Sequence, residues 1–210
     1  MRIGLISDTH IPTAGRDPST GLPGRAGRAG LWPQVYDALR GVDLIMHAGD
    51  LYDLVVLDWL EALAPVMAVS GNGDWGGWQR TEPPTDPRLR ESRVLTVDAP
   101  STGSLAGEAG QAPSTGTGHN LRIGLVHDLP LPESPPQRTL EGLMRHYFGG
   151  PVDVIVRGST HVAGIATLKG VLIVNPGSPT FPNHQGLRLG TVGYLDIEDG
   201  RVRPSILQLD

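Results

Sequence analysis

The chain has 210 residues, 39% of them hydrophobic, so it can bury a full core, and a single domain over residues 1–210 is the default expectation. A net charge of -5 argues against a standing nucleic-acid partner, and no segment approaches a membrane span or the apolar core of a signal peptide, so we expect a cytoplasmic protein. The absence of cysteine excludes disulfides and thiolate chemistry, which leaves nitrogen and oxygen atoms to hold any metal.

The first strand is predicted over residues 3–6, where a short apolar run stops at Ser7. Asp8 and His10 follow, so a carboxylate and an imidazole emerge together at one strand end. In an open sheet fed by helices, loops converge and ligands bind at the carboxyl ends of strands. The remaining strand ends are therefore the places to look for related chemistry.

A loop insertion is predicted over about residues 11–31, which are rich in glycine and proline and have no apolar period. A solvated insertion is the favoured interpretation, and the alternative is a lid whose Arg16, Arg25 and Arg28 reach an anionic substrate. A short helix follows over residues 34–40 and is expected to end at Gly41.

The next two strands are predicted over residues 42–46 and 66–69. Asp50 follows the former, and a glycine-rich turn with Asn72 and Asp74 follows the latter. The intervening helix is predicted from Asp53, as N-cap, to residue 63. His47 lies inside a buried strand end, where a hydrogen bond that supports the site is the expected role rather than metal ligation.

A second insertion, over residues 98–120, is low in complexity and contains APSTG twice. It is predicted to be the expanded tip of a hairpin between strands 94–97 and 121–126, the second of which ends at His127. A helix over 139–148 and a strand over 152–156 precede His161. From residue 164 onward, alternating short strands indicate that helices stop and a second sheet begins.

Polar side chains thus follow five predicted strands, although any one of them alone would be an ordinary turn former. Together they supply two carboxylates, three imidazoles and an amide, which is enough for two divalent ions that share a bridging carboxylate. The candidate metal ligands are Asp8, His10, Asp50, Asn72, His127 and His161.

The ordered series DTH, GDLYD, GNGD, the histidine after strand 121–126, and GSTH resembles the motifs of the calcineurin-like metallophosphoesterases. The small phosphodiesterases of the YfcE type are closest in length, and NPGS at residues 175–178 resembles a turn of that subfamily. The resemblance implies an α/β fold, a four-layer αββα sandwich of two mixed sheets flanked by helices. It also implies a dinuclear metal centre at the edge of the sheets.

By this resemblance Asp8, His10 and His161 would hold the first metal, Asp50 would bridge, and Asn72 and His127 would hold the second. A hydroxide between the ions would then attack phosphorus in line. The expected cofactor is a pair of divalent ions, with Mn²⁺ favoured and Fe, Zn or Ni as alternatives. The candidate catalytic residues are Asp50, Asn72 and Asp74, the last of which would orient the site or a water.

Two positions depart from the family pattern. Ser159 stands where the family has a histidine of the second metal site, so that site is expected to be weak unless His184 or Asp128 compensates. Gly73 stands where many members have a histidine that is proposed to protonate the leaving group, so substrates with good leaving groups are favoured.

The leading hypothesis is therefore a metal-dependent phosphodiesterase, a hydrolase that acts on a small phosphodiester. The alternative is a degenerate member with an impaired second metal site that acts as an interaction scaffold, because the chain also resembles a retromer subunit of the same superfamily. A homo-oligomer is compatible with either.

Trp75 and Trp78 are expected to wall a substrate pocket or to plug the core. Arg157 is expected to bind phosphate or to point into solvent.

Overall fold

The structure is a computed structural model that describes residues 1–11, 31–75, 85–98, 120–136, 138–182 and 189–210. Most of both insertions, with Arg16, Arg25 and Arg28, lies outside these residues, as do Trp78 and His184. Ten strands form two mixed sheets of five strands each within the described ranges. None of the helices in those ranges combines the length and apolar character needed to cross a membrane.

Sheet 1 has the strand order β10-β9-β1-β2-β3. Its parallel strands are joined at the β1 edge by an antiparallel hairpin, because β9 pairs with β1 and β10 pairs with β9. The parallel strands are β1 (Arg2–Ile6), β2 (Leu44–His47) and β3 (Val66–Ala68), and the hairpin strands are β9 (Thr191–Glu198) and β10 (Arg201–Gln208).

Sheet 2 has the strand order β4-β5-β6-β8-β7, with a parallel centre and an antiparallel strand at each edge. The β4 and β5 strands pair from Val97 with Leu121 onward, which confirms the predicted hairpin around the second insertion. The strands are β4 (Ser92–Val97), β5 (Leu121–Val126), β6 (Val154–Val156), β7 (Gly164–Leu168) and β8 (Val171–Asn175).

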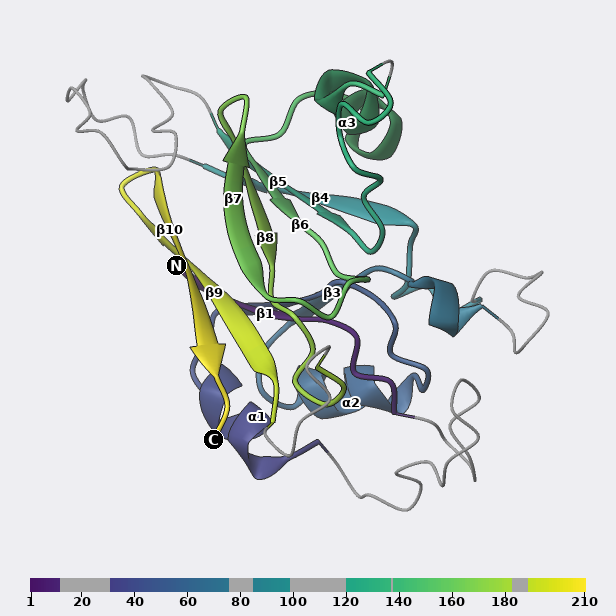
Figure 1. The fold of residues 1–210 in the computed structure, drawn as a ribbon. Coiled ribbons are helices and arrows are strands. Elements are labelled where there is room, and N and C mark those ends of the chain that lie inside the picture. Colours follow the sequence, from purple (N-terminus) through teal and green to yellow (C-terminus); the bar gives the residue numbers. More distant parts are fainter. Residues whose placement is uncertain (12–30, 76–84, 99–119, 137, 183–188) are drawn as a thin grey trace.

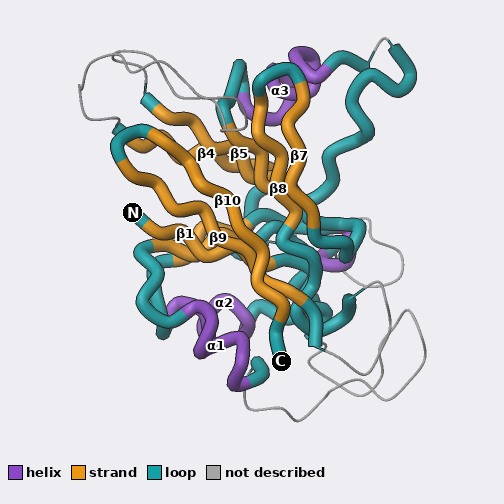
Figure 2. Tube along the Cα trace, turned by 60° about the vertical axis from the view of Figure 1, so that its left-hand side comes forward, coloured by secondary structure: helices purple, strands orange, loops and turns teal. Residues whose placement is uncertain are grey.

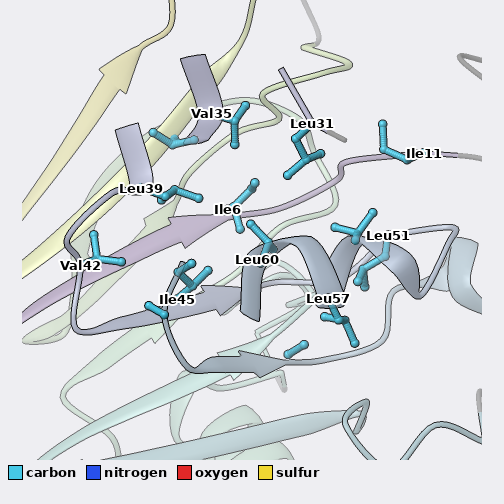
Figure 3. Packing of buried hydrophobic residues seen from close by; sticks show 14 of the residues in the cluster. Ile6, Ile11, Leu31, Val35, Leu39, Val42, Ile45, Leu51, Leu57 and Leu60 are labelled. Carbon is cyan, nitrogen blue, oxygen red and sulfur yellow. The ribbon is translucent and has the colours of Figure 1, made fainter. Parts of the chain in front are cut away.

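The sheets pack face to face, with helices on both outer faces, which confirms the four-layer sandwich (Figures 1 and 2). One core, with Leu5, Met46 and Leu125, lies between the sheets. A second lies between sheet 1 and its two helices, where Figure 3 shows Leu60 beside Ile6 and Ile45. A third lies between sheet 2 and its helix. The helices are α1 (Pro33–Leu39), α2 (Val55–Glu61) and α3 (Leu140–Phe148).

The helix ends follow local chemistry, with one correction. Thr139 caps α3 by accepting a hydrogen bond from the Gly142 amide at 3.0 Å. The prediction that α2 begins with Asp53 as its N-cap is wrong, because the helix starts at Val55 and Leu54 is the cap residue. The Asp53 carboxylate still accepts a hydrogen bond from the Val55 amide at 3.0 Å, so it satisfies one of the free donors of the first turn.

The C-terminal strands also correct the prediction that a second sheet begins after the last helix. Sheet 2 already contains β4, β5 and β6, and the last four strands divide into two hairpins, of which β7 and β8 extend sheet 2 while β9 and β10 extend sheet 1. Alternation of apolar residues shows which face of a strand is buried, but not which sheet edge receives it. The edge of β1 that does not face β2 pairs with β9 and so gains a hydrogen-bonded partner.

Candidate metal centre

Five loops meet at one edge of the sandwich, each of them after the carboxyl end of a parallel strand. They follow β1, β2 and β3 in sheet 1 and β5 and β6 in sheet 2. Within the described residues they form two groups whose ligand atoms all lie within 4.8 Å of one another. The first group is Asp8, His10 and His161, and the second group is Asp8, Asp50 and His127.

Asp8 is fully buried and belongs to both groups, although the resemblance assigns it only to the first metal. Its Oδ1 lies 3.4 Å from His161 Nε2 and 3.9 Å from His10 Nε2. The Ser7 hydroxyl donates to Oδ2 at 2.5 Å, and the Ser159 amide donates at 3.1 Å to the same oxygen. These bonds hold the carboxylate in place while Oδ1 faces the imidazoles.

The imidazoles of His127 and His161 present the same nitrogen to the cluster. His127 Nδ1 lies 2.7 Å from the Ala48 carbonyl oxygen, and His161 Nδ1 lies 2.6 Å from the Phe181 carbonyl oxygen. Because a carbonyl oxygen only accepts, each Nδ1 carries a proton, and in the neutral ring Nε2 is the nitrogen with the lone pair. This arrangement of outer partners is typical of metal-ligating histidines.

His10 supplies the strongest indication that the site fits a metal. Both of its ring nitrogens are buried without a hydrogen-bond partner among the described residues, although Nε2 lies 3.3 Å from Asp50 Oδ2. Burial opposes the imidazolium, but the carboxylates of Asp50 and Asp8 outweigh it and raise the pKa of His10 to about 9. A divalent cation would supply the positive charge that these carboxylates attract, and it would give one of the two ring nitrogens of His10 a partner.

Asp50 reaches one histidine of each group. Its Oδ2 lies 3.3 Å from His10 Nε2, and its Oδ1 lies 3.5 Å from His127 Nε2. Burial alone would raise the pKa of Asp50, but the facing His10 and His127 and a 2.6 Å hydrogen bond from the Gly73 amide hold it below its usual value. The ionised carboxylate is therefore placed where a bridging ligand would be needed.

Asn72 and Asp74 follow β3 in a short 3₁₀ turn, η1 (Asn72–Asp74), and have different positions. Asn72 Oδ1 lies 3.2 Å from His127 Nε2, which places this exposed side chain beside the second group. The Asp74 carboxylate instead accepts the amides of Asp50, Tyr52 and Gly71 at 2.8 to 3.0 Å. Asp74 thus positions the loop that carries Asp50, and burial raises its pKa.

Ser159 adopts a left-handed backbone conformation with φ 75°, and its amide serves Asp8. Because residue 159 is a serine, the second group lacks the imidazole that the family pattern would place there. Asp128, the described candidate to compensate, is exposed and belongs to neither ligand group found among the described residues. The other candidate, His184, lies outside those residues.

Tyr52 occupies the space that a side chain at position 73 would need. A Cβ built on Gly73 would lie 1.9 Å from Tyr52 Cε1, so a side chain at position 73 would require the tyrosine ring to move. The same phenol ring packs against the imidazole of His10, with 4.3 Å between ring centroids. Tyr52 lies inside the GDLYD motif, where no local pattern distinguishes this tyrosine from a turn residue.

The NPGS corner connects the site to the C-terminal half of the chain. The Asn175 side-chain amide donates to the Gly158 carbonyl and the Thr160 hydroxyl, both at 3.0 Å. The Ser178 hydroxyl donates to the Asp8 carbonyl at 2.7 Å. This corner therefore braces the loops that carry the first group, a role that the sequence pattern alone did not indicate.

His47 does not join either ligand group, as expected for a supporting histidine. It is fully buried, its Nε2 lies 3.2 Å from the Thr9 hydroxyl, and its Nδ1 accepts the Gly49 amide at 3.1 Å. Complete burial lowers the pKa of His47 to about 3, so the ring is neutral. It holds the loops after β1 and β2 together.

A pocket of about 370 Å³ opens beside the second group. Asn72 and His127 line it, so it is continuous with the ligand cluster. Trp75 is also a wall residue of this pocket, and a role of the pocket in substrate binding stays a prediction. The complete lining is Ser70, Gly71, Asn72, Trp75, Glu91, Val126, His127, Asp128 and Tyr147.

Residues 1–200 match the model of the calcineurin-like phosphoesterase superfamily domain. A probable metallophosphoesterase of Methanothermobacter thermautotrophicus is 34% identical over 184 residues, which cover 87% of this chain and 79% of that protein.

Two solved structures share the fold at low sequence identity. Zinc-bound Vps29 from Entamoeba histolytica is 20% identical, with a TM-score of 0.57 and complete coverage of both chains. A novel archaeal phosphodiesterase is 22% identical, with a TM-score of 0.52 over 99% of this chain and 100% of that one. With the family match over nearly the whole chain and the ligand groups at the sheet edge, this protein belongs to the calcineurin-like phosphoesterase superfamily, a family of metal-dependent phosphoesterases.

Proposed function

We propose that this metallophosphoesterase is a phosphodiesterase that hydrolyses a small phosphodiester with two divalent cations, of which Mn²⁺ is favoured. The observation that carries the proposal is the pair of ligand groups that share Asp8 and are spanned by Asp50. The fold similarity to an archaeal phosphodiesterase supports the choice of ester.

The donor atoms fit two cations. Asp8, His10 and His161 would hold one ion, Asn72 and His127 the other, and Asp50 would contact both. A set of carboxylate, amide and imidazole donors without thiolates suits Mn²⁺, and also Fe, Zn or Ni. When bound, two such cations lower the pKa of a shared water and neutralise charge on the attacking and leaving oxygens.

The surrounding residues hold this machinery in place and limit the substrate. Asp74 and the Gly73 amide fix Asp50, and the outer carbonyls fix the tautomers of the two histidines. Because Tyr52 fills the space beside Gly73, position 73 offers no acid to protonate the leaving alcohol. Loss of a positioned acid costs roughly a hundredfold or more, so esters of acidic alcohols are favoured.

The test combines metal content with turnover. Protein purified without chelator is expected to contain two metal ions per chain and to hydrolyse bis(p-nitrophenyl) phosphate, with stimulation by added Mn²⁺ and loss in EDTA. Hydrolysis of p-nitrophenyl phosphate, a monoester with the same leaving group, is expected to be slower.

The other outcomes decide between alternatives. A faster monoester reaction would overturn the diester assignment while keeping a metallophosphoesterase. One metal ion or none, with no turnover at any Mn²⁺ concentration, would instead favour the scaffold alternative, for which the absence of an imidazole at Ser159 is the motive.

A further inference from the structure

We infer that the pocket beside the second group binds an ester arm that carries an ammonium group, so that the preferred substrate is an amino-alcohol phosphodiester of the choline type. This inference rests on the proposed function, because it names the substrate class of the same site. Its support is the position, charge and aromatic lining of the pocket.

The position of the pocket decides which part of a substrate it would hold. Asn72 and His127 are both wall residues of the pocket, their side chains lie 3.2 Å apart, and His127 belongs to the second group. A phosphate at the ligand cluster would therefore extend one of its ester arms into the pocket. A volume of about 370 Å³ is large enough for a small alcohol arm with a trimethylammonium group.

The charge of the described pocket walls is negative. Glu91 and Asp128 line the pocket, and none of its described wall residues is a lysine or arginine. Burial raises the pKa of the Tyr147 hydroxyl, and the negative charges of Asp128 and Glu91 raise it further. The positive charge of Arg138 lowers the pKa of Tyr147, but Arg138 is not one of the residues that line the pocket. A cationic arm is thus attracted, whereas an arm with a second phosphate is repelled.

Two aromatic rings complete the environment that an organic ammonium needs. Trp75 follows the turn after β3, and Tyr147 lies on α3, so two aromatic residues from separate parts of the chain line the pocket. Val126 adds an apolar surface from β5. Aromatic faces combined with carboxylates bind quaternary ammonium groups through cation–π and Coulombic attraction. Exposed carboxylates without aromatic neighbours would attract a metal ion or a hydrated cation as well as an organic ammonium group.

The experiment compares two diesters of equal shape. One is p-nitrophenyl phosphocholine, and the other is p-nitrophenyl 3,3-dimethylbutyl phosphate. In the second diester a carbon atom replaces the nitrogen, so the arm loses its positive charge while the phosphate stays the same. We expect the ratio of their kcat/KM values, choline over neutral, to be about tenfold in the Mn²⁺-loaded protein. Glu91→Gln combined with Asp128→Asn should bring this ratio close to one, and Trp75→Leu should lower it as well.

Glu198→Gln provides the matched control. This carboxylate is exposed at the end of β9, away from the described pocket walls, so its loss changes net charge while the ratio stays at its original value. Both pocket carboxylates are exposed, so their variants are expected to fold, which circular dichroism would verify.

Turnover of both diesters at equal kcat/KM would overturn this inference alone. Absence of turnover for both would overturn the proposed function and the inference together.

Discussion

The two ligand groups of the metal centre differ in how completely the protein has built them. The rings of the first group pack among aromatic neighbours, because His10 packs on Tyr52 and lies 4.7 Å from the His161 ring, and both histidines neighbour Phe181. All three members of the second group are buried, whereas the neighbouring Asn72 is exposed and lines an open pocket. We infer that the two groups differ at their outer ligands, because a metal at the second group would depend on the exposed Asn72 and would lack an imidazole at Ser159.

The two groups are also braced by different parts of the chain. The first is held from the C-terminal half, where Asn175 and Ser178 bond the loops after β6 and β1. The second is held by the turn after β3, where Asp74 accepts three backbone amides. Asp50 connects the groups, since it contacts a histidine in each. Disturbing these parts separately therefore tests whether the groups act independently.

The largest effect is expected for Asp50→Asn, which removes the carboxylate that lies beside a histidine of each group. An amide keeps the shape but loses the negative charge that would face two cations, so turnover should fall by about a thousandfold or more. The measurement is kcat at saturating Mn²⁺, with circular dichroism as the control for folding. Unchanged turnover in a folded variant would show that neither ion depends on this residue.

An intermediate effect is expected for Ser159→His, which restores an imidazole to the second group. Histidine tolerates the left-handed conformation of this position better than most residues, as His10 and His161 show with φ 45° and 59°. The Mn²⁺ concentration for half-maximal activity should fall by roughly ten- to a hundredfold. Ser159→Ala is the matched control and should leave the titration nearly unchanged. An identical titration for all three proteins would mean that the second group is complete without residue 159.

The smallest effect is expected for Gly73→Ala, which tests the packing of Tyr52 beside the second group. The new methyl group would collide with the tyrosine ring, so the free energy of unfolding should fall by about 1 to 3 kcal/mol. Chemical denaturation measures this loss. Combining it with Tyr52→Ala makes room for the methyl group, so the double variant should lose less than the sum of the single losses. Strict additivity would show that the two positions do not compete for space.

Much of the fold was predictable because its signals are local. Buried strands are visible as short apolar runs, and the polar residues that follow them can be identified without any coordinates. The α3 helix was predicted to within a residue at its start, because Thr139 caps it and Gly149 adopts the left-handed conformation that ends it. The N-cap of α2 was predicted at Asp53, one residue before the observed cap Leu54. Asp53 still bonds the Val55 amide, and the apolar pattern of the helix does not show which of the two residues is the cap.

The sequence by itself determined which residues follow the strands and in what order, and therefore the family and the candidate ligands Asp8, Asp50 and His127. Only the tertiary structure decided which hairpin joined which sheet, which nitrogen each histidine presents, and that Tyr52 fills the space beside Gly73. The physical reason is the range of the interactions. Strand periodicity and turn chemistry act over a few neighbouring residues, whereas sheet edges, carbonyl partners and pocket walls bring together residues that are far apart in the chain.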